Sequence, residues 1–169
     1  MNDLPLKYSH FDVVFQEVPN ETTLAIDITG CPHGCPGCHS PFLSRYFGNN
    51  ILDEDNDDFS KEIVDELAKL NGMITCICMM GGDQNMNQLV AALAVAKNRY
   101  NLKTCVYSGI EKLDLNFWAR AIPLLDYLKI GNYIEALGGL KSKKTNQTFF
   151  SIKRDRLIDT TYEFQKEYK

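Results

Sequence analysis

The sequence lacks any long apolar run, and no stretch of its 169 residues approaches the length of a membrane-spanning helix. Its first residues, MNDLPLKYSHFD, have neither the basic start nor the apolar segment of a secretory signal peptide. Basic side chains are not in excess, since 18 Lys and Arg stand against 22 Asp and Glu, a net charge of −4. These absences predict a cytoplasmic protein with neither a membrane nor a nucleic acid as partner.

The composition is that of a folded domain. Hydrophobic residues make up 44% of the chain and aromatic residues 11%, which are values of globular rather than disordered proteins. A chain of 169 residues is long enough for one domain with its own core. Neither an internal repeat nor a linker-like segment divides the sequence, so we expect a single domain over residues 1–169.

Strand and helix patterns alternate along most of the chain. A first pair of strands, 11–18 and 22–29, flanks a turn at Pro19 and predicts an N-terminal hairpin. Further strands are expected at 73–80, 103–107, 127–130 and 147–152. Helices are expected at 59–70, 87–100 and 113–125, the last of them broken near Pro123. This order predicts an α/β fold with a mostly parallel sheet. The polar tail, 155–169, is expected to cover a sheet edge or to fray.

Distinctive residues follow the expected strands at their carboxyl ends, where ligands bind in parallel sheets. They are a cysteine loop after 22–29, Gly81-Gly82-Asp83 after 73–80, Ser108 after 103–107 and Gly131 after 127–130. We therefore expect a ligand site at this edge of the sheet.

The cysteine loop, CPHGCPGCHS at residues 31–40, holds Cys31, Cys35 and Cys38 in the spacing C-x3-C-x2-C. In a cytoplasmic protein such clusters are metal ligands or catalytic groups more often than disulfides. The remaining cysteines lie in apolar, strand-like runs and are expected to be buried, inert thiols; they are Cys76, Cys78 and Cys105.

Three metal sites are compatible with the loop. The segment CPGCH matches a haem attachment pattern, but it leaves Cys31 unexplained and belongs to exported proteins. Zinc would take the three cysteines plus His33 or His39, yet four ligands within one loop would link no distant segments. Three thiolates on a four-iron cluster leave one iron open to a substrate, which explains the triad best. We keep zinc as the alternative.

The residues around these motifs resemble a known family. The segments are TGCPHGCPGCHSP, GGDQN, VYSGIEKLD, YLKIGNYIEAL and TNQTFF, in that order, and the resemblance covers most of residues 8–152. The cysteine spacing is similar to that of the radical S-adenosylmethionine superfamily, and the longer segments resemble its activating proteins of anaerobic ribonucleoside-triphosphate reductases. This resemblance implies a partial, open β/α barrel.

The resemblance also implies roles for single residues. Cys31, Cys35 and Cys38 would bind a 4Fe-4S cluster, and the amino and carboxylate groups of S-adenosylmethionine would chelate the fourth iron. The other cofactor-binding residues implied are Gly37, Cys38 and His39 near the adenine, Gly81, Gly82 and Asp83 near the methionine ammonium, and Ser108. The family often has Pro after the acidic residue of the Gly-Gly-acid motif, where this sequence has Gln84.

The function implied is that of an activating enzyme. It would generate a 5′-deoxyadenosyl radical and install a glycyl radical on the large subunit of the anaerobic (class III) reductase, with electrons from a donor such as a flavodoxin. No residue is expected to act as a general acid or base. Two alternatives stay open: an activase of another glycyl-radical enzyme, of the pyruvate formate-lyase type, and a non-catalytic interaction module stabilised by zinc.

Overall fold

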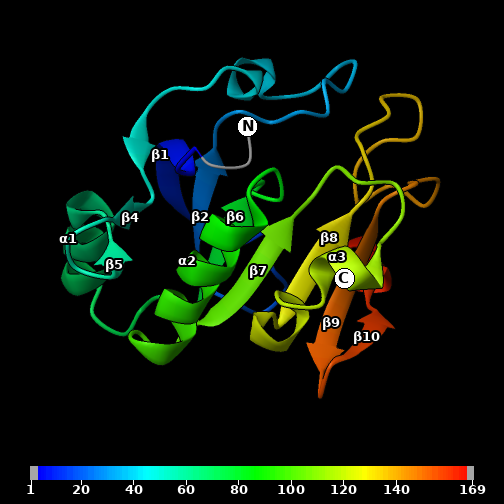
Figure 1. The fold of residues 1–169 in the computed structure, drawn as a ribbon. Helices are drawn as coiled ribbons and strands as arrows, with labels where there is room; N and C mark the ends of the chain where they lie inside the picture. Colours follow the sequence, from blue (N-terminus) through cyan, green and yellow to red (C-terminus); the bar gives the residue numbers. More distant parts are fainter. Residues whose placement is uncertain (1–3, 167–169) are drawn as a thin grey trace.

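The structure, a computed structural model, describes residues 4–166 and is built around one open sheet (Figure 1). Its eight strands lie in the order β10 (Arg156–Asp159), β9 (Thr148–Lys153), β8 (Tyr127–Ile130), β7 (Lys103–Tyr107), β6 (Cys76–Met80), β2 (Thr23–Ile28), β1 (Lys7–Val14) and β3 (Asn49–Asn50). The four central strands, β2, β6, β7 and β8, are parallel. β1 and β9 pair antiparallel with them on either side. The α/β class and the N-terminal hairpin are confirmed, although β1 lies four residues before the range expected for it. The sheet is mixed and open, and a β/α barrel is not confirmed.

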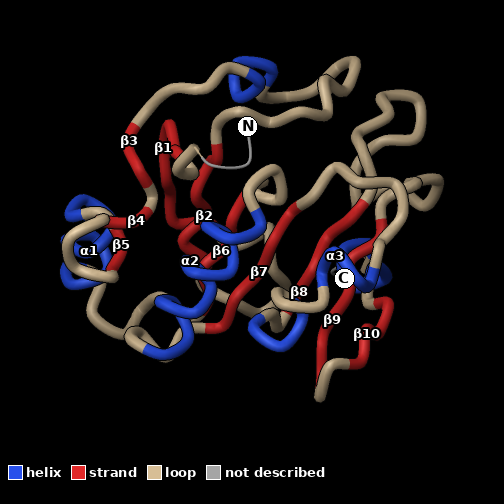
Figure 2. The backbone as a smooth tube through the Cα atoms, in the orientation of Figure 1, coloured by secondary structure: helices blue, strands red, loops and turns tan. Residues whose placement is uncertain are grey.

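The helices are few and short (Figure 2). They are α1 (Lys61–Lys69), α2 (Met86–Asn98) and α3 (Leu115–Trp118), with 3-10 turns η1 (Pro41–Ser44), η2 (Ile122–Leu124) and η3 (Thr161–Gln165). α2 begins where the Asn85 side chain accepts a hydrogen bond from the Gln88 amide at 3.1 Å, which caps an otherwise free N–H. None of the helices within residues 4–166 is long and apolar enough to cross a membrane.

The structure corrects several expected elements. The helix expected at 113–125 is only α3 followed by η2, because Pro123 lacks the N–H that would continue an α-helix. The acidic run at 53–58, to which no strand was assigned, forms a small hairpin of β4 (Leu52–Asp53) and β5 (Asp58–Phe59). β10 was not expected; Arg154 and Asp155, both at positive φ, turn the chain back from β9.

Both faces of the central sheet are covered, which explains the unbroken apolar sequence of β6. Ile77 and Met79 point to the side of α1 and α2, into the larger core. Cys76 and Cys78 point to the opposite side, where they join Cys105, Val18, Leu140 and Phe149 in a smaller core. The three cysteines of the strands are fully buried, as expected.

The described part of the C-terminal tail covers the smaller core. Phe164 of η3 contacts Phe149 of β9 edge to face, with ring centroids 4.8 Å apart. The Gln165 side chain donates hydrogen bonds to the backbone oxygens of Leu140 and Ser142, at 3.3 and 3.0 Å. The tail is thus tied to the sheet as far as Lys166, and the expected fraying of 167–169 lies outside the described residues.

Candidate metal centre

The cysteine loop leaves β2 at the carboxyl edge of the parallel strands, at the same end of the sheet as the loop that follows β8 (Figure 1). Gly30, Gly34 and Gly37 have positive φ values of 79°, 56° and 75°, a backbone shape that glycine adopts without steric cost. The segment around η1 holds the start of the loop, because the amides of Gly30 and Cys31 donate to Arg45 O and Leu43 O at 2.8 and 2.9 Å. The loop is therefore irregular but anchored.

Cys31, Cys35 and Cys38 line one cavity of ≈ 230 Å³. The cavity is closed by the residues Ile28, Gly34, Ser40, Pro41, Leu43, Ser44 and Met80. The three thiols are free and half-buried. Within residues 4–166 no three His, Cys, Asp or Glu side chains are already arranged to hold a metal ion, so the loop would have to draw its thiols together around one.

Neither histidine of the loop lines the cavity of the three thiols. The His33 imidazole lies 3.7 Å from the Asp83 carboxylate. The His39 ring is exposed and contacts the Tyr133 ring, with centroids 4.9 Å apart. The donor set of the cavity is therefore three thiols without a histidine, which suits a cluster with one open iron better than a closed four-ligand zinc site.

Burial raises the pKa of the Cys31 thiol, and the neighbouring Asp83 and cysteines raise it further. A hydrogen bond from the His33 backbone N–H to the Cys31 sulfur acts in the opposite direction. The Ser40 amide donates a similar bond to the Cys38 sulfur at 3.4 Å. Thiols bind metals as thiolates, so these N–H groups are placed to support the metal-bound form.

Gly81-Gly82-Asp83 follows β6 beside the loop. Gly81 and Gly82 have φ values of 113° and 107°, which an L side chain rarely adopts. Gln84, the departure from the family pattern, links two strand ends: its Oε1 accepts from the Gly82 amide at 3.0 Å, and its Nε2 donates to Thr29 O at 2.9 Å. Sequence reasoning missed this role, which only the register of β2 and β6 reveals.

The structure brings Asp83 and Ser108 together from two neighbouring strands. Ser108 is 2% exposed, and its hydroxyl donates to Asp83 Oδ2 at 2.5 Å while accepting from the Ile110 amide at 3.2 Å. Ser108, which was expected near the cofactor, thus contacts Asp83, another residue of the expected site. It therefore orients the carboxylate that follows the two glycines.

Gly37 and His39 lie on the outer half of the loop, against the segment that follows β8. A Cβ at Gly37 would lie 3.3 Å from the Glu135 carboxylate, so the two segments touch here. Asn146 and Gln147 hold the start of that segment, donating to Asn132 O at 3.0 Å and to Gly131 O at 3.4 Å. These contacts give the pair a structural role.

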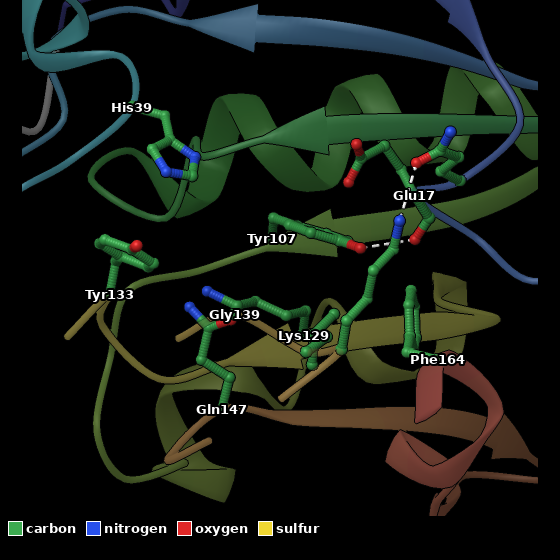
Figure 3. Close-up of a pocket in the computed structure, with 11 residues that line it drawn as sticks. Glu17, His39, Tyr107, Lys129, Tyr133, Gly139, Gln147 and Phe164 are labelled. Carbon is green, nitrogen blue, oxygen red and sulfur yellow. Dashed lines mark hydrogen bonds between the residues drawn. The ribbon is translucent and has the colours of Figure 1, made fainter. Parts of the chain in front are cut away.

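Lys129 was missed by sequence reasoning, although a lysine inside the apolar strand YLKI is itself unusual. It is 8% exposed, and its Nζ donates to Gly131 O at 2.6 Å. Burial lowers its pKa to about 8, and the nearby loop cysteines oppose that shift. It faces a second cavity of ≈ 400 Å³ (Figure 3), whose other lining side chains include His39, Tyr107, Tyr133, Gln147 and Phe164.

Comparison with known proteins agrees with this geometry. A family model described as a 4Fe-4S single cluster domain matches residues 22–153, from the start of β2 to the end of β9. No curated protein matches the chain. No solved structure matches it either. Because the family match spans more than half of the chain, the protein belongs to the 4Fe-4S single cluster domain family and is an iron–sulfur protein.

Proposed function

We propose that the protein is a cytoplasmic radical S-adenosylmethionine enzyme, the activase of an anaerobic (class III) ribonucleoside-triphosphate reductase. The observation that carries the proposal is the set of three thiols around one cavity, without a histidine, at the carboxyl edge of the parallel strands. Cys31, Cys35 and Cys38 would hold the cluster and leave one iron for the substrate. The family match supports the cluster, and the motifs after each strand support the cofactor.

When bound by Cys31, Cys35 and Cys38, the cluster would supply the electron for cleavage of S-adenosylmethionine to methionine and a 5′-deoxyadenosyl radical, and this radical would take a hydrogen atom from a glycine of the partner. A one-electron donor such as a flavodoxin would reduce the cluster beforehand. The chain contributes placement and shields the site from water. No proton transfer by a side chain is needed.

Asp83 would receive the methionine ammonium. Its carboxylate is 9% exposed and is oriented by Ser108, so it offers a fixed acceptor for a charge-assisted hydrogen bond. The glycines at 81 and 82 leave the backbone open to close approach by the same part of the ligand.

Lys129 and the ring pair His39–Tyr133 line the second cavity from different sides. A buried ammonium there would attract an anionic or hydroxyl-rich part of the ligand, and the aromatic rings would pack on its adenine. His39 keeps the role that the resemblance implies, with Tyr133 beside it.

The glycine-bearing loop of a large partner would enter through the open side of the sheet. The strand order runs from β3 to β10 without closure, so the chain does not enclose its substrate on its own. The second cavity, which begins at His39 beside the cysteine loop, would accept a narrow backbone such as that of glycine.

Anaerobic reconstitution tests the proposal. We expect about four irons per chain, little zinc, and a glycyl-radical doublet in the electron paramagnetic resonance spectrum of the reductase after incubation with reductant and S-adenosylmethionine. Replacing Cys31, Cys35 or Cys38 by Ala should abolish cofactor cleavage. The matched control Cys105→Ala removes a fully buried thiol of the smaller core and should keep the iron while costing about 1–2 kcal/mol of stability.

Two other results would identify the alternatives. A colourless protein that keeps one zinc after reconstitution would reject the cluster and leave the zinc-stabilised module. Cofactor cleavage without a doublet on the reductase, but with one on a pyruvate formate-lyase type enzyme, would move the assignment to that partner.

A further inference from the structure

His33 lies in the first half of the cysteine loop and points into the protein together with the thiols. Residues 31, 33 and 35 are half-buried, whereas the intervening residues 32 and 34 are exposed. The side chain of His33 is 21% exposed, which is low for a residue of an irregular loop. The loop thus sends an imidazole inward between two of its cysteines.

The imidazole is wedged between the ends of two strands. Its Nε2 lies 3.7 Å from Asp83 Oδ2, too far for a hydrogen bond, and this nitrogen is fully buried with no hydrogen-bond partner in the described part of the chain. On the other side the ring lies against Gly109, where a Cβ would come within 2.6 Å of His33 Cγ and Cδ2. Gly109 is not in the left-handed region, so this position needs glycine for space.

The backbone of the same residue contacts a proposed cluster ligand. The His33 backbone N–H lies close to the Cys31 sulfur and favours its thiolate form. A reduced cluster carries an additional negative charge, which N–H donors to its sulfur ligands stabilise, so such bonds raise the reduction potential. The position of this N–H is set by where the His33 side chain is held, because the loop around it has no regular hydrogen bonding.

We propose that His33 is a positioning residue: its imidazole, wedged between Asp83 and Gly109, holds its own backbone N–H on the Cys31 sulfur. This contact raises the reduction potential of the cluster and slows its loss. The inference rests on the proposed ligation of the cluster by Cys31, but it requires neither S-adenosylmethionine nor the partner protein.

Two substitutions on opposite sides of the contact test the wedge. His33→Leu removes the imidazole, and Gly109→Ala inserts a methyl group into its place without changing the loop sequence. In the reconstituted protein, we expect both to make the midpoint potential more negative and to speed iron loss to a chelator by about tenfold or more. In the double variant, iron loss should be accelerated by less than the product of the two single accelerations, because both substitutions disrupt the same contact.

His10→Leu is the matched control, since His10 is an exposed histidine of β1 whose ion-pair partner is Asp12. It should leave the potential and the rate of iron loss unchanged. If His33→Leu fails to fold, two other variants test the role of His33. They are Gly109→Ala and His33→Gln, and the latter keeps a donor in the buried position.

If Gly109→Ala, or both single variants, had the wild-type midpoint potential and rate of iron loss, the proposed role of His33 would be wrong. This failure is distinct from a failure of the proposed function. If only the activase assignment failed, the wild-type protein would hold the cluster without forming a glycyl radical on the reductase; if the cluster assignment failed, the wild-type protein would hold no iron.

Discussion

Lys129 places an amine in the interior of the molecule, where a charge is costly. Its side chain leaves β8, the last of the parallel strands, and Gly131 O is its hydrogen-bond acceptor. Sequence reasoning did not single out this residue, because a lone lysine belongs to no motif. The Asp83–Ser108 pair, in contrast, was expected at one site, since the ends of neighbouring parallel strands meet there.

Replacing Lys129 by Met should stabilise the protein near pH 7. The folded pKa is lowered to about 8, so the unfolded state binds more protons between pH 8 and the ordinary pKa of lysine, and stability rises with pH across that window. Below pH 8 the charged form costs about 3 kcal/mol, which Lys129→Met removes. Chemical denaturation of the apo-protein at several pH values measures the difference.

The increase in the free energy of unfolding that Lys129→Met causes should become smaller as pH rises above 8. The variant should also bind S-adenosylmethionine less well. The exposed Lys153 of β9 provides the control, and Lys153→Met should change stability by less than about 0.5 kcal/mol. A Lys129→Met variant that is less stable than wild type at pH 7 would show that the contacts of the ammonium in the folded protein offset the cost of burying its charge.

At the scale of elements, Glu21 ties the amino ends of the sheet together just before β2. It is 7% exposed and accepts hydrogen bonds from Lys103 of β7 at 2.5 Å, Tyr127 of β8 at 2.7 Å and Thr75 at 2.7 Å. Burial alone would raise the pKa of Glu21, but these donors together lower it. The network lies at the end of the sheet opposite the cysteine loop and serves stability.

Glu21→Gln should therefore destabilise the protein at neutral pH by about 1–3 kcal/mol. Because the folded pKa is lowered, the contribution of Glu21 is present above the unfolded pKa and is lost as pH falls through the folded pKa. Wild type and Glu21→Gln should thus converge in acid, which urea unfolding at stepped pH would show.

The exposed pair Lys61–Asp65 of α1 offers the comparison, and Asp65→Asn should have no measurable effect. If the difference in the free energy of unfolding between wild type and Glu21→Gln stayed constant from pH 7 to acid, the lost stability would come from packing and not from the charge.

Elements with strong local signals were predictable. The apolar run of β6 and the buried face of α1, with Ile63 and Leu67, were recognised from their patterns. β10 was missed because Arg154-Asp155 lacks the glycine or asparagine that marks a tight hairpin turn. α3 is short because its extent depends on Pro123 and on packing of Trp118 in the larger core, which a local pattern does not reveal.

At the scale of the molecule, two different covers protect the two faces of the sheet. The helices α1 and α2 cover one face. The loop before β2, the segment near Leu140 and the C-terminal η3 cover the other. That second cover borders the cavity beside Lys129, so it combines a structural role with a place at the proposed site. The sequence predicted that the tail would cover part of the sheet, but not that it would border this cavity.

Phe164→Ala should loosen the second cover without removing the cluster. Loss of the contact with Phe149 should lower stability by about 1–2 kcal/mol and increase the reactivity of the buried thiols Cys78 and Cys105 towards an alkylating reagent. Mass spectrometry resolves the labelling peptide by peptide, so the loop cysteines do not interfere. Tyr162, exposed in the same turn, gives the control Tyr162→Ala. Unchanged labelling of Cys78 and Cys105 would show that η3 does not control access to this face.

The ends of the open sheet also govern how copies of the protein meet one another. One outer strand, β3, has two residues, Asn49 and Asn50, and the other, β10, has four, including Arg156 and Asp159. Short edge strands that carry polar or charged side chains are poor templates for strand addition by a neighbouring molecule. Concentrated samples for spectroscopy should therefore resist edge-to-edge aggregation, although the sheet never closes on itself.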